Sequence, residues 1–381
     1  MSDIFDLLEE SASQGGSEAA FEFLVERFRQ EKNYPLLFDA LLMKKRNQLG
    51  LPLVWAQSFP DLNEDQHQDY ERAYMVAARD VGELFLKEGD IAGAWPYFQA
   101  IGEQKTIADA VEICELDSME EAEAVIEIAF GQGVHPRRGF QLILEHRGLC
   151  RAISAFSQYP VQDGREDCAA LLVQQLYQDL VENLKIGIAR TEEKEPKTDS
   201  LRSLISGRDW LFEGESYHID TSHLASVVRF SMELFDGETL ALAVELAEYG
   251  QKLSSMFQYE EHPPFEGGYK DYTIYLKALM GEEVDQAVKH FRGKVDELDL
   301  AEVGSYPAQV VVGLLSRLQR YEEAIQVSVD HLKEVRGSEL GCPNIAQLCQ
   351  LAGNYGKLMQ LAREKSDLLE FTAGMLQRST S

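Results

Sequence analysis

Two histidines and an aspartate lie close together in the sequence, at His218, Asp220 and His223. Imidazole nitrogens and carboxylate oxygens are ligands that Zn²⁺ and Mn²⁺ accept. Side chains at this spacing converge on one cation when His218 and Asp220 lie on an extended segment and His223 lies on the opening turn of a helix. We therefore predict a divalent-metal site, and a metal-dependent hydrolase or a metal-binding protein is one functional class to consider.

The fourth ligand of such a site would come from a second irregular segment, residues 258–272 (QYEEHPPFEGGYKDY), through Glu260, Glu261 or His262. A structural interpretation competes with this one, because Asp220 is a good N-cap for the helix that LASVVRFSMEL predicts. The His-x-Asp-x-x-His spacing defines no family, unlike His-Glu-x-x-His. Both interpretations stay open at the level of the sequence.

Other reaction chemistries lack their motifs. No G-x-G-x-x-G, Walker A or G-x-S-x-G sequence occurs, so nucleotide binding and serine-hydrolase chemistry have no support. The five cysteines are widely spread and include no C-x-x-C pair, which predicts a reducing compartment and no zinc knuckle. We expect no cofactor other than the divalent metal of the alternative above.

The chain is strongly acidic. Its 381 residues include 36 Lys and Arg against 65 Asp and Glu, a formal net charge of −29. Nucleic-acid affinity depends on Lys and Arg that displace counterions, so such a surface repels phosphate backbones and anionic lipids. We predict no nucleic-acid partner, whereas a protein or peptide partner with a basic patch fits this charge.

The N-terminal sequence MSDIFDLLEESASQGG is acidic and has neither the basic start nor the apolar core of a signal peptide. No apolar run approaches the roughly 18 residues that a membrane-spanning helix needs. These features predict no membrane association and a cytoplasmic location.

The elements that must position these residues are predicted to be short paired helices. In residues 310–332 (VVVGLLSRLQRYEEAIQVSVDHL), two amphipathic helical patterns flank a turn at residues 319–321, and a small alanine opens the second helix. The same pattern recurs elsewhere in the chain. Its marker residues, early in each second helix, are Leu37, Ala94, Ala287, Ala324 and Leu358.

The string RYEEA at residues 320–324 resembles part of a tetratricopeptide repeat, and the marker spacings of 37 and 34 residues bracket that family's period. The copies lack the family's early tryptophan and its terminal proline, and they cover roughly half the chain. The resemblance implies an all-α fold, a right-handed antiparallel helix-pair solenoid that is irregular in the middle third. It also implies a concave groove that binds a peptide or a helix of a partner.

Three parts are predicted along the chain. Residues 1–160 and 236–381 contain the helix pairs, and residues 161–235 contain a long helix, the charged run TEEKEPKTD and the segment with His218. From the resemblance we expect a non-enzymatic protein-interaction or scaffold protein. The metal-dependent hydrolase is the alternative.

Overall fold

The computed structural model describes residues 3–54, 63–116, 118–159, 163–214 and 216–378. Every regular element in these ranges is a helix, and no strand occurs in them. The predicted all-α fold is therefore confirmed.

Residue contacts divide the chain into two compact units, Met1–Gly148 and Leu149–Ser381. The sequence predicted three parts, with boundaries after residues 160 and 235, and this finer division stays a prediction. Each unit is described below by itself.

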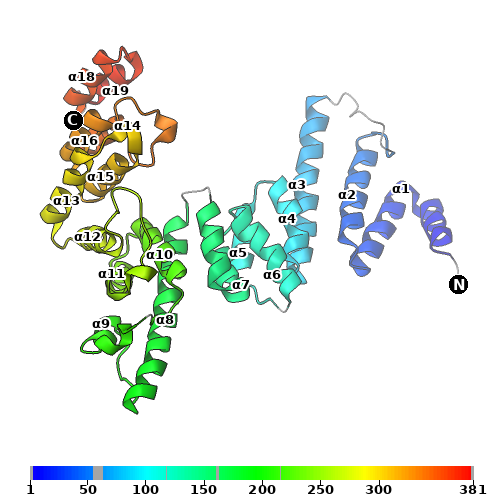
Figure 1. Cartoon of the computed structure of the whole chain (residues 1–381). Helices are drawn as coiled ribbons and strands as arrows, with labels where there is room; N and C mark the ends of the chain where they lie inside the picture. Colours follow the sequence, from blue (N-terminus) through cyan, green and yellow to red (C-terminus); the bar gives the residue numbers. More distant parts are fainter. Residues whose placement is uncertain (1–2, 55–62, 117, 160–162, 215, 379–381) are drawn as a thin grey trace. The chain divides into compact units, whose positions relative to one another are not determined.

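The first unit is built from helices of one to seven turns. They are α1 (Ile4–Gln30), α2 (Tyr34–Gln48), α3 (Glu64–Lys87), α4 (Ile91–Ala100), α5 (Gln104–Ile113), α6 (Met119–Ile126), the π-helical turn η1 (Glu127–Gly131) and the first part of α7 (Pro136–Gln158). Within this unit α2 packs against both α1 and α3, and α3 lies beside α4 (Figure 1). The approach of α3 to α4 depends on Gly82, where a Cβ would lie 2.6 Å from the ring of Phe98.

The second unit begins within α7 and contains the remaining helices. They are α8 (Arg165–Glu192), α9 (Leu201–Ile205), α10 (Thr221–Phe230), α11 (Gly237–Lys252), α12 (Tyr269–Leu279), α13 (Val284–Glu297), α14 (Leu300–Val303), α15 (Tyr306–Arg317), α16 (Tyr321–His331), α17 (Ile345–Leu351), α18 (Tyr355–Glu364) and α19 (Leu368–Arg378). Single 3₁₀ turns, η2 (Asp209–Phe212), η3 (Ser231–Glu233), η4 (Ser255–Phe257) and η5 (Gly337–Glu339), lie between them. The long helix α8 packs against α10 and α11, and its leucines at every fourth position from Leu172 to Leu184 are buried.

The five marker residues occupy equivalent positions. Each lies four residues after the residue that precedes its helix, and its backbone N–H donates to that residue's carbonyl at 2.9 to 3.2 Å. Their side chains are at most 7% exposed. The corresponding helices pack as the pairs α1 with α2, α3 with α4, α12 with α13, α15 with α16, and α17 with α18. The predicted helix pairs are thus present within both units.

Candidate functional site

A groove of about 610 Å³ runs along one face of α15 in the second unit. Gln309, Val310, Gly313, Ser316 and Arg317 line it, and this spacing places them on the same side of α15. The opposite walls come from α10, η3, α12 and the loop at residues 341–343. We call this hollow the α15 groove. It lies on the first helix of the α15–α16 pair.

Two aromatic side chains of the α15 groove are accessible to solvent. Phe235 is 66% exposed and Tyr306 is 49% exposed, whereas Tyr275, which also lines the groove, is 3% exposed. Large aromatic side chains supply much of the binding energy in protein interfaces, because they bury a large apolar area at a small entropy cost. Phe235 and Tyr306 are therefore available as anchoring contacts for a ligand.

Arg317 fixes the position of Phe235. Its guanidinium donates to the carbonyl of Met232 at 2.5 Å and also to the carbonyl of Leu234. The guanidinium carbon lies 4.2 Å from the centre of the Phe235 ring, a cation–π arrangement. Burial lowers the pKa of Arg317, but an arginine side chain stays protonated in proteins. The wall that carries Phe235 is thus held to α15 before any ligand binds.

Gln309 fixes the facing wall in the same manner. Its Oε1 accepts from the backbone N–H of Gly341 at 2.6 Å, and its Nε2 donates to the carbonyl of Glu339 at 3.3 Å. Between the two fixed walls, the floor at Gly313 carries no side chain, and a Cβ added there would meet no atom within 4 Å. The α15 groove is preformed and open at its centre.

The α15 groove includes one thiol and three charged side chains. Cys342 lines the groove, and burial raises the pKa of its thiol to about 11, so it stays protonated. The charged side chains along the groove have both signs, with Arg229 and Arg317 on one hand and Glu233 on the other. This composition suits binding through apolar contacts and hydrogen bonds.

The predicted metal ligand His218 lies in the loop before α10 and is half-buried. Its backbone N–H donates to the Tyr249 hydroxyl at 3.1 Å, and its Nδ1 lies 3.2 Å from the same oxygen. Asn183 donates to the carbonyl of His218 at 2.9 Å. Burial lowers the pKa of His218, which favours the neutral imidazole.

Asp220 is the N-cap of α10, as the structural interpretation predicted. Its Oδ1 accepts from the backbone N–H of Ser222 at 2.9 Å and of His223 at 3.2 Å. The Ser222 hydroxyl donates to the same oxygen at 2.6 Å, and this bond is the main cause that lowers the pKa of Asp220. The carboxylate is therefore occupied by the start of its own helix.

Three residues were candidates for a fourth ligand. Glu260 and His262 are exposed, and Glu261 accepts from the Tyr272 hydroxyl at 3.4 Å. Within the described ranges, no three His, Cys, Asp or Glu side chains form a group that could hold a metal ion. The metal site at His218, Asp220 and His223 remains a prediction.

Three residues of the α15 groove, Gly313, Phe235 and Arg317, were not predicted from the sequence. The sequence pattern could have indicated Gly313, because a glycine in the middle of an amphipathic helix is unfavourable unless a ligand or another segment must come close to the backbone there. Phe235 offered a weaker signal, as an aromatic residue directly before a helix N-cap at Asp236. Arg317 offered none, since its partners are remote in the sequence.

Comparison with models of known protein families, with curated proteins and with solved structures finds no match for this chain. No helix in the described part of the chain has the length and apolar character needed to cross a membrane.

Proposed function

We propose that this protein is a non-enzymatic interaction protein that binds a peptide or a helix of a partner protein in the α15 groove. The observation that carries the proposal is a preformed groove on the first helix of a pair, with Phe235 and Tyr306 accessible and with open space above Gly313. The tetratricopeptide resemblance supports it, because helix-pair proteins of that kind bind partners along first-helix faces. A right-handed solenoid in which successive pairs stack is part of this proposal.

The partner segment that we propose carries an apolar anchor residue flanked by lysine or arginine. The anchor would contact Phe235 and Tyr306. The flanking cations would lie outside the groove, which is lined by two arginines and one glutamate, and would complement the acidic surface of a chain of net charge −29. The five cysteines are free thiols, which fits the reducing, cytoplasmic location that the sequence predicts.

The substitution Gly313→Phe tests the groove. A Cβ at this position meets no atom within 4 Å, so the backbone accepts a side chain there, and we expect the phenyl ring to occupy the groove. The matched control is Gly293→Phe in α13, another helical glycine whose Cβ would point into open space and which does not line the groove. Both proteins should keep the thermal stability of the parent.

A displayed library of short random peptides is selected on the parent protein, and calorimetry measures the affinity of each enriched peptide for the three proteins. We expect peptides with an apolar anchor and basic flanks, bound at least about tenfold more weakly by Gly313→Phe and equally well by Gly293→Phe. Peptides that bind all three proteins alike, or a library without any enriched sequence, would contradict the proposal.

A further inference from the structure

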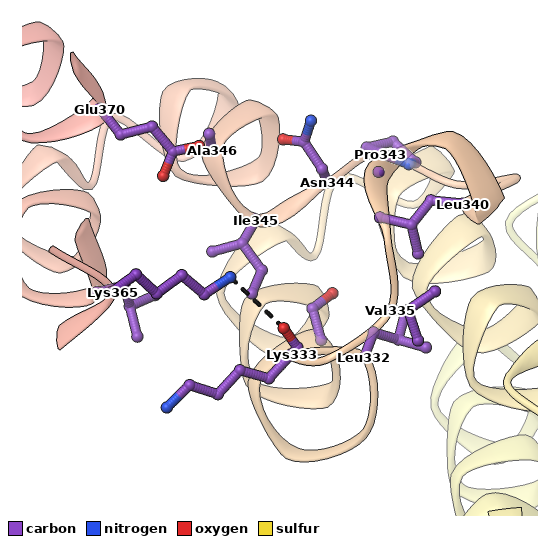
Figure 2. A pocket seen from close by; sticks show the side chains of 13 residues that line it. Leu332, Lys333, Val335, Leu340, Pro343, Asn344, Ile345, Ala346, Lys365 and Glu370 are labelled. Carbon is purple, nitrogen blue, oxygen red and sulfur yellow. Dashed lines mark hydrogen bonds between the residues drawn. The ribbon is translucent and has the colours of Figure 1, made fainter. Parts of the chain in front are cut away.

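A second hollow, of about 190 Å³, lies between the end of α16, the start of α17 and the helices α18 and α19 (Figure 2). Most of its wall is aliphatic, and Leu332, Val335, Leu340 and Ile345 are labelled around it in Figure 2. We call it the Ser328 pocket, after the buried serine in its wall. It is separate from the α15 groove, although Pro343 contributes to both.

The hydroxyl of Ser328 has no hydrogen-bond partner among the described residues, although the residue is only 2% exposed. A serine inside a helix usually donates to the carbonyl four residues earlier. Other helical serines of this unit do so, such as Ser226 to Ser222 at 2.9 Å and Ser231 to Val227 at 2.8 Å. The wall of the hollow therefore contains a buried hydroxyl that lacks a partner among the described residues and could donate to a ligand.

One lysine supplies positive charge at the hollow. Lys365 at the end of α18 lines the pocket. Its ammonium points toward the carbonyl of Lys333 at 3.5 Å, a long contact that uses one of its three donors (Figure 2). Lys333 also belongs to the wall, but its ammonium lies 3.5 Å from Glu364 and is paired with that carboxylate. Glu370 is the other charged residue of the wall.

The size of the pocket limits the ligand. A closed apolar cavity of about 150 Å³ holds benzene, so 190 Å³ accommodates a molecule of about eight non-hydrogen atoms. An aliphatic wall favours a branched hydrocarbon body, and the Ser328 hydroxyl with the Lys365 ammonium favours a carboxylate. Glu370 in the same wall repels every carboxylate, so a ligand with one carboxylate is favoured over a ligand with two.

We propose that the Ser328 pocket binds a small monocarboxylate with a branched aliphatic body. The carboxylate would accept hydrogen bonds from the Ser328 hydroxyl and the Lys365 ammonium. Such a group occurs in a free acid and at the C-terminal residue of a peptide, and the test separates these two sources.

Ligand-observed NMR with the full chain measures binding of 4-methylpentanoate and of its neutral amide. Two acetylated peptides that end in leucine, one with a free carboxylate and one amidated, form the second arm. We expect the free acid to bind and the amide to bind at least about tenfold more weakly. If the peptide acid binds more tightly than 4-methylpentanoate, the source is a chain terminus, and if less tightly, a free acid.

Two variants and their matched controls locate the site. Lys365→Met and Ser328→Ala should each weaken binding about five- to tenfold, whereas Lys357→Met on the same helix and Ser226→Ala should leave it unchanged. Ser328→Ala should not lower the melting temperature, because it removes a hydroxyl that has no partner among the residues that the structure describes. If Ser328 had a purely structural role, Ser328→Ala should lower the melting temperature.

Equal binding of acid and amide, no binding of either acid, or unchanged affinity in Lys365→Met and Ser328→Ala would overturn the proposal. Gly313→Phe should bind 4-methylpentanoate like the parent. The test of the Ser328 pocket can therefore fail or succeed independently of the test of the α15 groove.

Discussion

Around His218, burial and one hydroxyl group together favour the neutral ring. The Tyr249 hydroxyl already accepts from the backbone N–H of His218, so its own proton is free to be donated to Nδ1. Burial raises the pKa of Tyr249 to about 12, and the hydroxyl therefore remains a donor at neutral pH. A protonated imidazole would place a second N–H against the same oxygen inside a half-buried site. Both effects favour neutral His218.

The variant His218→Asn tests this linkage. Burial lowers the native pKa of His218 below its unfolded value of about 6.5. Between these two pKa values the unfolded chain binds more protons than the folded chain. The contribution of neutral His218 to stability is therefore complete above about pH 6.5 and is lost as the pH falls from there through the native pKa. Urea unfolding between about pH 7.5 and pH 5 should show a smaller loss of free energy in the variant than in the parent. Parallel curves for the two proteins would refute the assignment.

At the scale of helices, a common turn positions the second helix in four of the five pairs. A residue with positive φ comes just before the residue that precedes the second helix, at Lys32, Gly89, Gln319 and Gly353. The next residue then accepts a backbone hydrogen bond from the marker residue, the fourth residue of the new helix. Because these four turns have the same length, the marker side chain is placed alike in each of the four pairs. Small or aliphatic residues there permit close packing.

The variant Ala94→Leu should destabilise the first unit. Ala94 is fully buried in α4, so the added carbons have no space and we expect a loss of about 1–3 kcal/mol. Ala92 is exposed on the same helix, and Ala92→Leu should change the free energy of unfolding by less than about 0.5 kcal/mol. Chemical denaturation measures both values. Similar effects of the two substitutions would show that Ala94 is not a packing position.

At the scale of the whole molecule, charge opposes compactness. A net charge of −29 makes like charges repel across the folded surface, and the unfolded chain relieves this repulsion by expanding. Many acidic side chains are paired in exposed ion pairs, such as Glu31 with Arg27 and Asp69 with Arg72. Exposed pairs of this kind contribute little each, so the excess of acidic groups dominates.

We therefore expect salt to stabilise the protein. Raising NaCl from about 20 mM to about 300 mM shortens the screening length and should raise the melting temperature. KCl at the same ionic strength should act alike, which separates screening from specific ion binding. A melting temperature that falls with added NaCl would mean that the ion pairs outweigh the repulsion.

The sequence by itself determined the features that depend on near neighbours along the chain. Pro136 begins α7, the leucines from Leu172 to Leu184 lie along one buried face, and Asp220 caps α10. Helices follow from local hydrogen bonds and from the period of apolar residues, so a window of a few turns is sufficient to predict them. For the same reason the marker residues could be located before their packing was known.

Only the tertiary structure decided the two candidate binding sites. The α15 groove requires Arg317 to reach the carbonyl of Leu234, which lies 83 positions earlier in the sequence. The Ser328 pocket requires Lys365 to meet Lys333 across 32 positions. No local sequence pattern predicts these contacts, because they depend on the simultaneous packing of several helices. His218, Asp220 and His223 are also close together in the sequence. In the structure, His218 contacts the hydroxyl of Tyr249, which is distant in the sequence, and Asp220 accepts from the first backbone N–H groups of α10.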